Sequence, residues 1–222
     1  MKAMLLAAGR GERLRPLTDA LPKPLVPVAG KPLIAWHLAA LARAGFHEIV
    51  VNTSWLAERL HAALGDGSAW GVSISWSDEG PVPLETGGGI LRALPLLGPG
   101  PFLVVNADTW TDIDFASLAL EPDAHAHLVL VPNPPHHLRG DFGLEGNRVV
   151  SRDSDRLTYS GIGVYRPEFF ADCGGERFPL LPLLNRAIAA RRVRGELHCG
   201  AWSDVGTTER LAALDARLRA LQ

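Results

Sequence analysis

Short, continuous apolar runs alternate with longer helix-like patterns in the first half of the chain, and this alternation limits the fold more than any other feature. Continuous apolar runs fit strands that are buried on both faces, as in a parallel sheet. Parallel neighbours need crossover connections, which helices supply. We therefore predict an α/β fold, a three-layer sandwich with a mostly parallel sheet. The predicted strands are Lys2–Ala7, Glu48–Asn52, Val72–Trp76 and Phe102–Asn106, and the predicted helices are Pro32–Ala44, Trp55–Leu64 and Gly88–Leu97.

After about residue 125 the pattern changes. Pro132-Asn133-Pro134-Pro135 interrupts the chain, and Gly146-Asn147 lies between two short runs like a hairpin turn. We expect this part to add a small mixed-strand, substrate-facing elaboration to the Rossmann-like sheet. No repeat or linker divides the sequence, so we predict a single domain, 1–222, with halves 1–124 and 125–222. The elements predicted in the second half are the strands Ala126–Val131, Leu157–Tyr165 and Glu196–Cys199 and the helices Leu181–Arg191 and Thr208–Leu221.

The charge balance and the cysteine count exclude several classes of protein. The formal net charge is -2, with 22 basic and 24 acidic residues, so the chain has no cationic field for a nucleic acid or an anionic membrane. Cys173 and Cys199 are too few for a disulfide framework or a four-thiolate zinc site, which fits a reducing compartment. The apolar run after Lys2 is cut short by Arg10, and no uncharged stretch reaches the ~20 residues of a membrane span. We therefore expect a soluble, cytoplasmic protein.

The first predicted strand leads directly into the loop Ala8-Gly9-Arg10-Gly11-Glu12-Arg13-Leu14. Glycines let backbone N–H groups approach a phosphate, and α/β sheets bind ligands at the carboxyl ends of their strands. The dinucleotide-binding pattern needs glycine at Leu14, and the P-loop pattern needs glycine at Leu25 and Lys-Ser/Thr at Lys31-Pro32. Neither pattern matches, which disfavours a dehydrogenase. A phosphate cradle and an ordinary glycine-rich loop both remain open at this point.

The loop continues as Arg13-Leu14-Arg15-Pro16-Leu17-Thr18 and is followed by Pro22-Lys23-Pro24. Proline on each side is expected to hold Lys23 in a fixed, extended conformation. Only three of the 22 basic residues are lysines, so arginine serves wherever a generic surface cation suffices. A rigid lysine beside a phosphate-binding loop is suited to neutralising charge in phosphoryl or nucleotidyl transfer. A solvated surface lysine is the alternative.

Together these segments resemble the sugar-1-phosphate nucleotidyltransferase family. Its signature G-x-G-x-R-L-x-P-L-T, followed by P-K-P, matches Gly9–Thr18 and Pro22–Pro24. The resemblance implies that Arg13 and Lys23 are catalytic and contact the phosphates of a nucleoside triphosphate. The residues that it implies for the nucleotide-binding loop around them are Gly9, Gly11 and Glu12.

Two aspartates are the candidate metal ligands. Asp108 follows the apolar run 102–105 and therefore emerges at the same sheet edge as the glycine-rich loop, and Asp204 lies just before the last predicted helix. Two carboxylates and substrate phosphate oxygens make the all-oxygen octahedron that Mg²⁺ prefers. In the family such aspartates bind the metal. Each is also typical of a turn or a helix cap, and that alternative stays open for Asp204.

A closer resemblance concerns the acceptor substrate. Hexose-specific members of the family commonly carry a Glu-Lys pair that binds the sugar phosphate, and no such pair occurs between Gly143 and Gly161. Over nearly its full length the chain is instead similar to N-acetylmuramate-1-phosphate uridylyltransferases of bacterial cell-wall recycling. The segments that carry this similarity are Asn52–Leu56, Glu85–Gly89, Asn133–Pro135, Arg139–Gly143 and Thr158–Gly163.

This resemblance divides the chain into a nucleotide-binding half, 1–124, and a sugar-binding half, 125–222. It implies that Gly88, at a helix start, packs near the nucleotide base. It also implies that Asp141 accepts hydrogen bonds from the sugar, although a β-turn aspartate fits equally well. Asn106 and Gly161 complete the expected sugar site. The remaining candidates for pocket contacts, of which the histidines also fit a solvated loop, are His136, His137, Trp110 and Trp202.

The sequence thus predicts an Mg²⁺-dependent enzyme that condenses UTP with N-acetylmuramic acid 1-phosphate to UDP-N-acetylmuramic acid and pyrophosphate. The alternatives within the class are glucose- or mannose-1-phosphate thymidylyl-, uridylyl- or guanylyltransferases and a phosphocholine cytidylyltransferase. A non-catalytic sugar-nucleotide sensor is the alternative from another class, and the four catalytic and metal-binding candidates argue against it. We expect a monomer, because no β-helix or second domain follows the last predicted helix, and no nucleic-acid or membrane partner.

Overall fold

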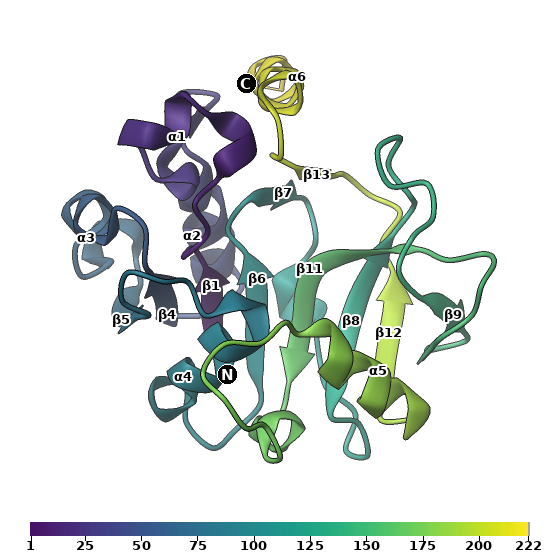
Figure 1. Cartoon of the computed structure of the whole chain (residues 1–222). Helices are drawn as coiled ribbons and strands as arrows, with labels where there is room; N and C mark the ends of the chain where they lie inside the picture. Colours follow the sequence, from purple (N-terminus) through teal and green to yellow (C-terminus); the bar gives the residue numbers. More distant parts are fainter. Residues whose placement is uncertain (222) are drawn as a thin grey trace.

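The computed structural model describes residues 1–221, and its centre is one nine-stranded sheet with the order β5-β4-β1-β6-β11-β8-β12-β10-β9. Strands from both halves of the sequence belong to this sheet (Figure 1). β5, β4, β1, β6, β8 and β12 run in one direction, while β11 and β10 are antiparallel to their neighbours, which confirms the mostly parallel α/β prediction. The strands are β1 Lys2–Leu6, β2 Pro27–Val28, β3 Lys31–Pro32, β4 Glu48–Thr53, β5 Ser73–Asp78, β6 Phe102–Asn106, β7 Thr109–Thr111, β8 Ala126–Val131, β9 Gly143–Glu145, β10 Arg148–Val150, β11 Thr158–Tyr165, β12 Val193–Leu197 and β13 Trp202–Asp204.

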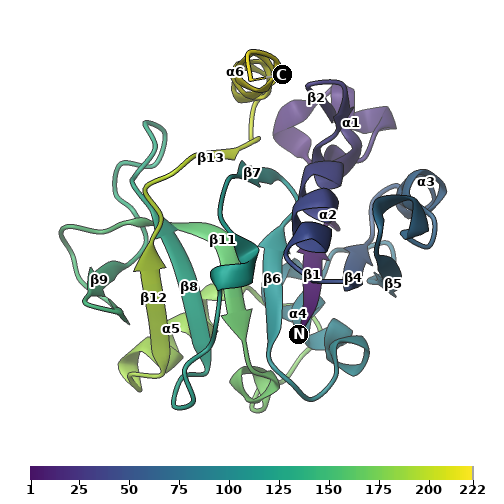
Figure 2. The same ribbon diagram turned by 180° about the vertical axis from the view of Figure 1, so that it is seen from behind.

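Helices cover both faces of the sheet, as a three-layer sandwich requires. α2 and α3 share one apolar core, which includes Leu38 and Leu60, and α4 and α5 share a second core on the other face, which includes Ile90 and Leu184. Figure 1 shows α4 and α5 in front of the sheet, and Figure 2, from behind, shows α2 in front. No helix within residues 1–221 is long and apolar enough to cross a membrane. The helices are α1 Leu17–Ala20, α2 Leu33–Arg43, α3 Ala57–Leu64, α4 Glu85–Leu97, α5 Leu181–Ala189 and α6 Thr208–Arg219, with short 3-10 turns at Glu12–Leu14, Lys23–Leu25, Ser68–Trp70, Phe115–Ser117 and Pro167–Phe170.

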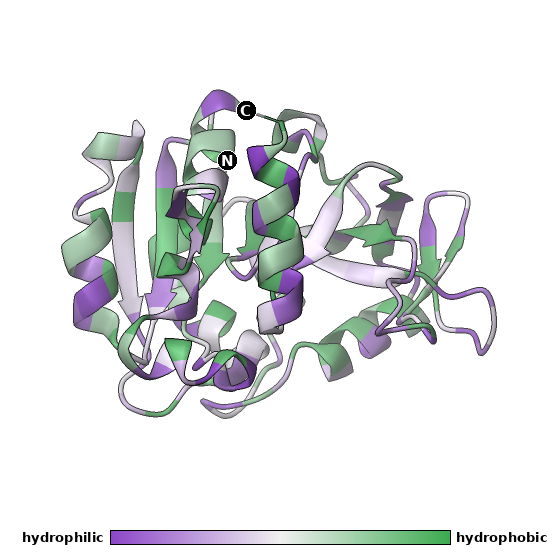
Figure 3. Cartoon of the chain, turned by 90° about the horizontal axis from the view of Figure 1, so that it is seen from above, coloured by the Kyte–Doolittle hydropathy of each residue, from purple (hydrophilic) through white to green (hydrophobic). Residues whose placement is uncertain are grey.

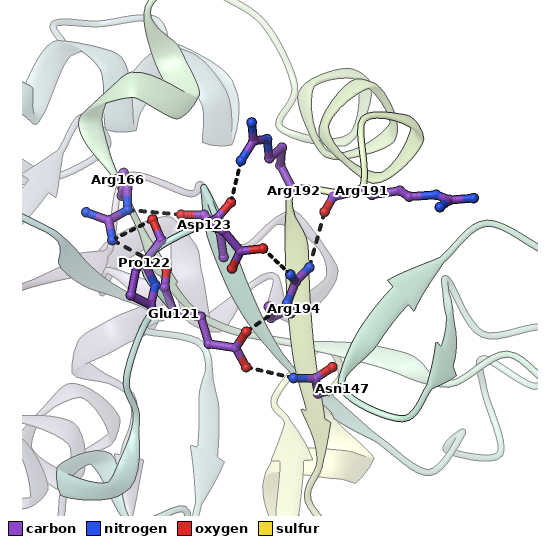
Figure 4. A network of polar contacts seen from close by, with 9 residues as sticks. Glu121, Pro122, Asp123, Asn147, Arg166, Arg191, Arg192 and Arg194 are labelled. Carbon is purple, nitrogen blue, oxygen red and sulfur yellow. Dashed lines mark hydrogen bonds and ion pairs between the residues drawn. The ribbon is translucent and has the colours of Figure 1, made fainter.

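The position of the last sheet strand differs from the prediction. The sequence pattern predicts a strand over Glu196–Cys199, but β12 begins at Val193. Arginines in and before this strand give it the appearance of a polar loop. Arg194 is only 6% exposed, because its guanidinium is bonded to Glu121 and Asp123 (Figure 4). A paired, buried arginine therefore conceals a strand from pattern analysis.

Helix α4 begins at Glu85, three residues before the predicted start at Gly88. The Glu79 carboxylate accepts a hydrogen bond from the Leu84 N–H at 2.7 Å and thereby fixes the entry to the helix. Glycine is a poor helix former, but a Cβ at Gly89 would overlap the same Glu79 carboxylate. Close packing therefore requires glycine here and overrides its low helix propensity.

The segment between β1 and α2 forms several short elements that the sequence pattern does not predict, namely two 3-10 turns, α1 and the β2–β3 hairpin. The extended conformation expected for Lys23 is wrong, because Lys23 begins the 3-10 turn 23–25. Pro22, directly before the turn, is extended, with φ -56 and ψ 136. Pro24 fits inside the turn, since its fixed φ is compatible with a helical start and the first N–H groups of a turn have no partner in it.

The last helix, α6, packs on this N-terminal segment. Leu214 joins Leu14 in a small third core, and the Asp215 carboxylate accepts a hydrogen bond from the Ala29 N–H at 2.7 Å. Seen from above, α6 lies across the molecule with hydrophilic and hydrophobic residues mixed along it (Figure 3). β13 leads into α6 and pairs with β7. The segment between β1 and α2 and the helix α6 therefore meet on the side of the sheet where β1 ends.

Candidate active site

Three adjoining pockets lie where β1, β4 and β6 end. The central pocket, about 210 Å³, is bordered by Ala8, Asn52, Glu79, Thr86 and Asp108. The loop pocket, about 760 Å³, is bordered by residues 9–14, Lys23, Glu85, Asp108, Arg177 and Gly206. The strand pocket, about 300 Å³, is bordered by Asn106, Asp141, Phe142, Tyr159 and Leu184. A fourth, outer pocket of about 580 Å³ is bordered by His136, Trp202, Asp204 and Arg210.

The glycine-rich loop after β1 folds closely against Lys23. Gly11 has φ 65, and a Cβ there would lie 3.0 Å from the Cβ of Lys23, so the position favours glycine. The Thr18 hydroxyl donates a hydrogen bond to the Gly11 carbonyl at 2.8 Å. The predicted loop residues that border the loop pocket are Gly9, Gly11, Glu12 and Arg13. The structure therefore brings the predicted nucleotide-binding loop around one open space.

Lys23 and Asp108 form an ion pair between the central and loop pockets. The Lys23 Nζ lies 2.5 Å from Oδ2 of Asp108, and both residues border both pockets. Lys23 is only 8% exposed, whereas the Asp108 side chain is 39% exposed. The ammonium is thus held by the protein and still opens onto the two pockets. The predicted lysine and one predicted metal ligand meet as expected.

The ladder between β7 and β13 brings the two predicted metal ligands to neighbouring backbone positions. The Val205 N–H, directly after Asp204, donates a hydrogen bond to the Asp108 carbonyl at 2.8 Å. Their side chains have different partners. Asp204 binds Arg210 at 2.5 Å, lies 3.0 Å from Nε2 of His136 and borders the outer pocket. The two carboxylates therefore lie in adjacent pockets and share no protein partner.

Each aspartate has the carboxylate oxygens that Mg²⁺ prefers, but none of the four pockets is bordered by both. Their side chains are 39% and 23% exposed, so each can reach a ligand. No group of three or more His, Cys, Asp or Glu side chains within the described chain could hold a metal ion by itself. The protein therefore offers two carboxylates, and Mg²⁺ commonly binds one or two carboxylates together with substrate phosphates and water.

A buried polar network lies beneath the central pocket, and the sequence analysis did not identify it. The Asn52 Oδ1 accepts a hydrogen bond from the Ala7 N–H at 2.6 Å, and its Nδ2 donates to Oε1 of Glu79 at 2.6 Å. The other Glu79 oxygen accepts from Leu84, so the network joins the ends of β1, β4 and β5 to α4. Burial raises the pKa of Glu79, although these hydrogen bonds oppose the shift. The available signal was that Asn52 and Glu79 lie at or just after the carboxyl ends of strands, where α/β sheets place ligand-binding residues.

Gly88, predicted to lie near a nucleotide base, is not among the residues that border the four pockets. Its N–H donates to the Phe178 carbonyl at 3.1 Å, and a Cβ there would overlap the Glu176 carbonyl. Because α4 begins early, Glu85 and Thr86 occupy the place expected for Gly88 beside the central pocket. Gly88 thus serves the packing of α4, and Glu85 and Thr86 are better placed for ligand contacts.

The residues predicted to bind a sugar border or support the strand pocket. Asn106 and Asp141 border it. Gly161 lies at a bulge in β11 with φ 79, and a Cβ there would overlap the Asn106 side chain, so Gly161 supports Asn106. Asp141 accepts a hydrogen bond from the Tyr159 N–H at 2.8 Å and lies 3.0 Å from Nε2 of His137. Asp141 is therefore both a turn carboxylate and a pocket residue.

Aromatic residues near the aspartates have separate roles. Trp202 borders the outer pocket, whereas Trp110 packs edge-on against Trp36 in the third core. His37, which the sequence analysis did not identify, lies beneath the β7 turn, with Nε2 2.6 Å from the Thr109 carbonyl. Burial lowers the pKa of His37 to about 4, so the imidazole is neutral and donates this hydrogen bond. His37 therefore supports the turn that carries Asp108.

Several known proteins are similar to this chain in sequence, and others are similar to it in fold. The family profile described as nucleotidyl transferase matches residues 2–147. The N-acetylmuramate alpha-1-phosphate uridylyltransferase from Neisseria meningitidis serogroup B is 53% identical to this chain, over 97% of both sequences. The enzyme of the same name from Caulobacter vibrioides is 38% identical, over 97% of this chain and 96% of its own length. A UTP–glucose-1-phosphate uridylyltransferase from Synechocystis sp. is 32% identical, over 82% of this chain and 55% of its own.

Solved structures of low sequence identity have the same fold. The inositol-1-phosphate CTP transferase from T. maritima has a TM-score of 0.82 at 19% identity, covering 99% of this chain and 94% of its own. HddC from Yersinia pseudotuberculosis has a TM-score of 0.79 at 20% identity, covering 98% and 99%. These two likenesses support the α/β architecture alone.

Proposed function

Because the chain belongs to the nucleotidyl transferase family, we propose that it condenses UTP with N-acetylmuramic acid 1-phosphate to give UDP-N-acetylmuramic acid and pyrophosphate. The observation that carries the choice of substrates is the 53% identity to the Neisseria meningitidis uridylyltransferase over 97% of both chains. The pockets are compatible with it. Arg10, Arg13 and Lys23 border the loop pocket, which suits a triphosphate, whereas Asp141 is the one charged residue bordering the strand pocket, which suits a pyranose.

In the proposed reaction, a phosphate oxygen of the sugar 1-phosphate attacks the α-phosphorus of UTP in line. A new P–O bond forms there, the bond from the α-phosphorus to the bridging oxygen of the β-phosphate breaks, and pyrophosphate leaves with that electron pair. The nucleophile is already anionic, so no general base is needed, and catalysis depends on alignment and charge neutralisation. Lys23 and Arg13 would neutralise charge on the α-phosphate and on the departing pyrophosphate.

Asp108 and Asp204 would hold Mg²⁺, which would supply further charge neutralisation and a template for the triphosphate. The backbone of the Gly9 and Gly11 loop would enclose the phosphates, with Glu12 at its rim, and Glu85 and Thr86 would lie near the base. On the acceptor side, Asn106 and Asp141 would bind the sugar, with Gly161 keeping Asn106 in place. The proposal extends to a cytoplasmic, monomeric enzyme of bacterial peptidoglycan recycling, a setting suggested by the bacterial sources of the relatives named above.

The test is a screen for pyrophosphate release by the purified protein. UTP, dTTP, GTP and CTP are each combined with N-acetylmuramic acid 1-phosphate, glucose 1-phosphate, mannose 1-phosphate and phosphocholine, with Mg²⁺ or with EDTA. We expect the highest kcat/KM for UTP with N-acetylmuramic acid 1-phosphate, and no turnover with EDTA. A higher kcat/KM for any other pair contradicts the substrate assignment, and ligand binding without pyrophosphate release in any pair indicates a sensor.

A further inference from the structure

Two guanidinium groups from opposite ends of the sequence meet beside Gly206. A Cβ built on Gly206 would overlap Nη2 of Arg210 and lie 3.2 Å from Nη2 of Arg13. Arg13 comes from the glycine-rich loop and borders the loop pocket, whereas Arg210 comes from the first turn of α6 and borders the outer pocket. The missing side chain at Gly206 therefore leaves the space in which the two arginines converge.

These two arginines have few protein partners. The Arg210 Nη1 donates to Asp204 at 2.5 Å and lies 2.6 Å from Nε2 of His136, while its Nε and Nη2 have no hydrogen-bond partner within residues 1–221. The Arg13 side chain is exposed and has no hydrogen bond or ion pair with any residue in that range. The two guanidiniums lie close together and only Arg210 has a carboxylate partner, so a bound anion would relieve the repulsion between them. Most of their N–H groups point to no protein acceptor, so an external anion has donors to bind.

We propose that Arg210 is a further phosphate-binding residue, which forms with Arg13 a two-guanidinium clamp over Gly206. Guanidinium groups match the geometry of phosphate oxygens and bind them with charge-assisted hydrogen bonds. The clamp lies between the loop pocket and the outer pocket, next to Asp204. It provides positive charge, whereas no basic residue borders the strand pocket. Its ligand is a phosphate group of UTP or of the sugar 1-phosphate. The inference rests on the proposed function, because that function supplies both phosphates.

Calorimetric binding tests the clamp without requiring turnover. UTP is titrated alone, and the sugar 1-phosphate is titrated in the presence of a UTP analogue whose α,β bridge cannot be cleaved, both at saturating Mg²⁺. Arg210→Ala should weaken one of these ligands by at least about tenfold, the scale of losing a hydrogen bond to a charged group. Arg210→Lys should recover part of the affinity, since it keeps the charge and loses the fork. Gly206→Ala should weaken the same ligand, because its methyl group displaces Arg210 while every charge remains.

The matched control is Arg219→Ala, since Arg219 lies on the same helix, is exposed and pairs with Asp215. It should bind both ligands as the wild type does. Weakening of UTP assigns the clamp to the triphosphate, and weakening of the sugar 1-phosphate assigns it to the acceptor. If the wild-type protein binds these ligands but releases no pyrophosphate, the proposed function is contradicted. The clamp is then still tested by the ligand affinities of the variants.

Two outcomes overturn the clamp. In the first, Arg210→Ala binds both ligands with affinities within about twofold of the wild type. If Arg210→Ala does not fold, the same result for Arg210→Lys and Gly206→Ala overturns the clamp. In the second, affinity at saturating Mg²⁺ is unchanged and only the Mg²⁺ concentration for half-maximal binding rises. Arg210 would then act through Asp204 and not on phosphate.

Discussion

Arginine is used in two different ways on the two sides of this molecule. On the side away from the pockets, the guanidinium of Arg194 bonds to Glu121, to Asp123 and to the Arg191 carbonyl, and its surroundings are a continuous polar network (Figure 4). Beside the pockets, Arg13 has no partner within residues 1–221, and Arg210 shares one carboxylate with a histidine. Arg194 is buried with a full set of protein partners and stabilises the fold, whereas the exposed Arg13 and the partly buried Arg210 keep N–H groups that a ligand can reach. We therefore expect the number of protein partners to distinguish charges that support the fold from charges that bind a ligand.

The largest test of this difference is Lys23→Ala. We expect kcat/KM to fall by roughly 10²–10³, the scale of losing one preorganised charge contact. Lys31→Ala is the control, because the Lys31 Nζ packs 3.5 Å from the centre of the Trp36 ring and borders none of the pockets described above. Steady-state kinetics on both variants measure the effect. Turnover close to wild type in Lys23→Ala would remove this residue from the binding charges.

The pH dependence of stability examines the support beneath Asp108. Burial lowers the pKa of His37 from 6.5 to about 4, so between these values the unfolded chain binds more protons than the folded one. The free energy of unfolding should therefore decrease as the pH falls from 6.5 towards 4, by an amount on the order of 3 kcal/mol in full. His37→Gln can still donate to the Thr109 carbonyl and should flatten this dependence in denaturant unfolding. Identical pH profiles for the two proteins would contradict the assignment.

Arg194→Met examines the opposite side of the molecule. The variant keeps most of the length of the side chain but leaves Glu121 and Asp123 without their shared guanidinium. We expect the free energy of unfolding to fall by about 1–3 kcal/mol, with kcat and KM unchanged. Thermal denaturation and steady-state kinetics give the two readouts. A fall in kcat/KM with unchanged stability would mean that the number of partners does not separate the two kinds of charge.

The smallest expected effect concerns Glu79, which is fully bonded and yet borders the central pocket. In Glu79→Gln, the donors of Asn52 and Leu84 face a side chain with one acceptor oxygen, so one hydrogen bond is lost. We expect a loss of about 1 kcal/mol in unfolding free energy and a rise of a few-fold in KM for UTP.

A reciprocal exchange makes this test specific. In the double variant Asn52→Asp/Glu79→Gln, the new carboxylate accepts from the Ala7 N–H and from the new amide, whose oxygen accepts from the Leu84 N–H. Stability and KM should return towards wild type in the double variant. A double variant no better than Glu79→Gln would show that the direction of these hydrogen bonds is not what matters.

The strands and helices that form the layers of the fold were predictable, because the hydrophobic pattern that determines each of them lies within its own short segment of sequence. Continuous apolar runs and helical periodicity identified β1, β4, β6, β8 and β11 and most helices to within a few residues. β12 was misplaced because Arg194 is buried through ion pairs with Glu121 and Asp123, and a single-sequence pattern counts arginine as exposed. The turn at Lys23 was misjudged because prolines restrict single residues and do not determine how a short turn closes.

The clustering of some candidate residues was predictable, because Asn106 and Asp108 lie at or just after the end of β6, at the same sheet edge as the loop after β1. Lys23 and Asp108 meet as expected, and Asn106 and Asp141 border one pocket. The Asn52–Glu79 pair needed knowledge that β4 and β5 are neighbours, which periodicity alone does not supply. Arg210 was missed for a different reason. In a helical pattern it has the appearance of an ordinary surface arginine, and its proposed role depends on the absent side chain at Gly206.

The docking of α6 on the N-terminal segment has a consequence for how the enzyme comes into being. The glycine-rich loop is translated long before Asp204, Gly206 and Arg210, and the helix that contains Arg210 also packs against Leu14. A nascent or prematurely terminated chain that spans residues 2–147 contains the whole stretch matched by the family profile but lacks Trp202, Asp204 and Arg210 of the outer pocket. We therefore expect a chain that stops before α6 to lack the outer pocket and the cover over Leu14.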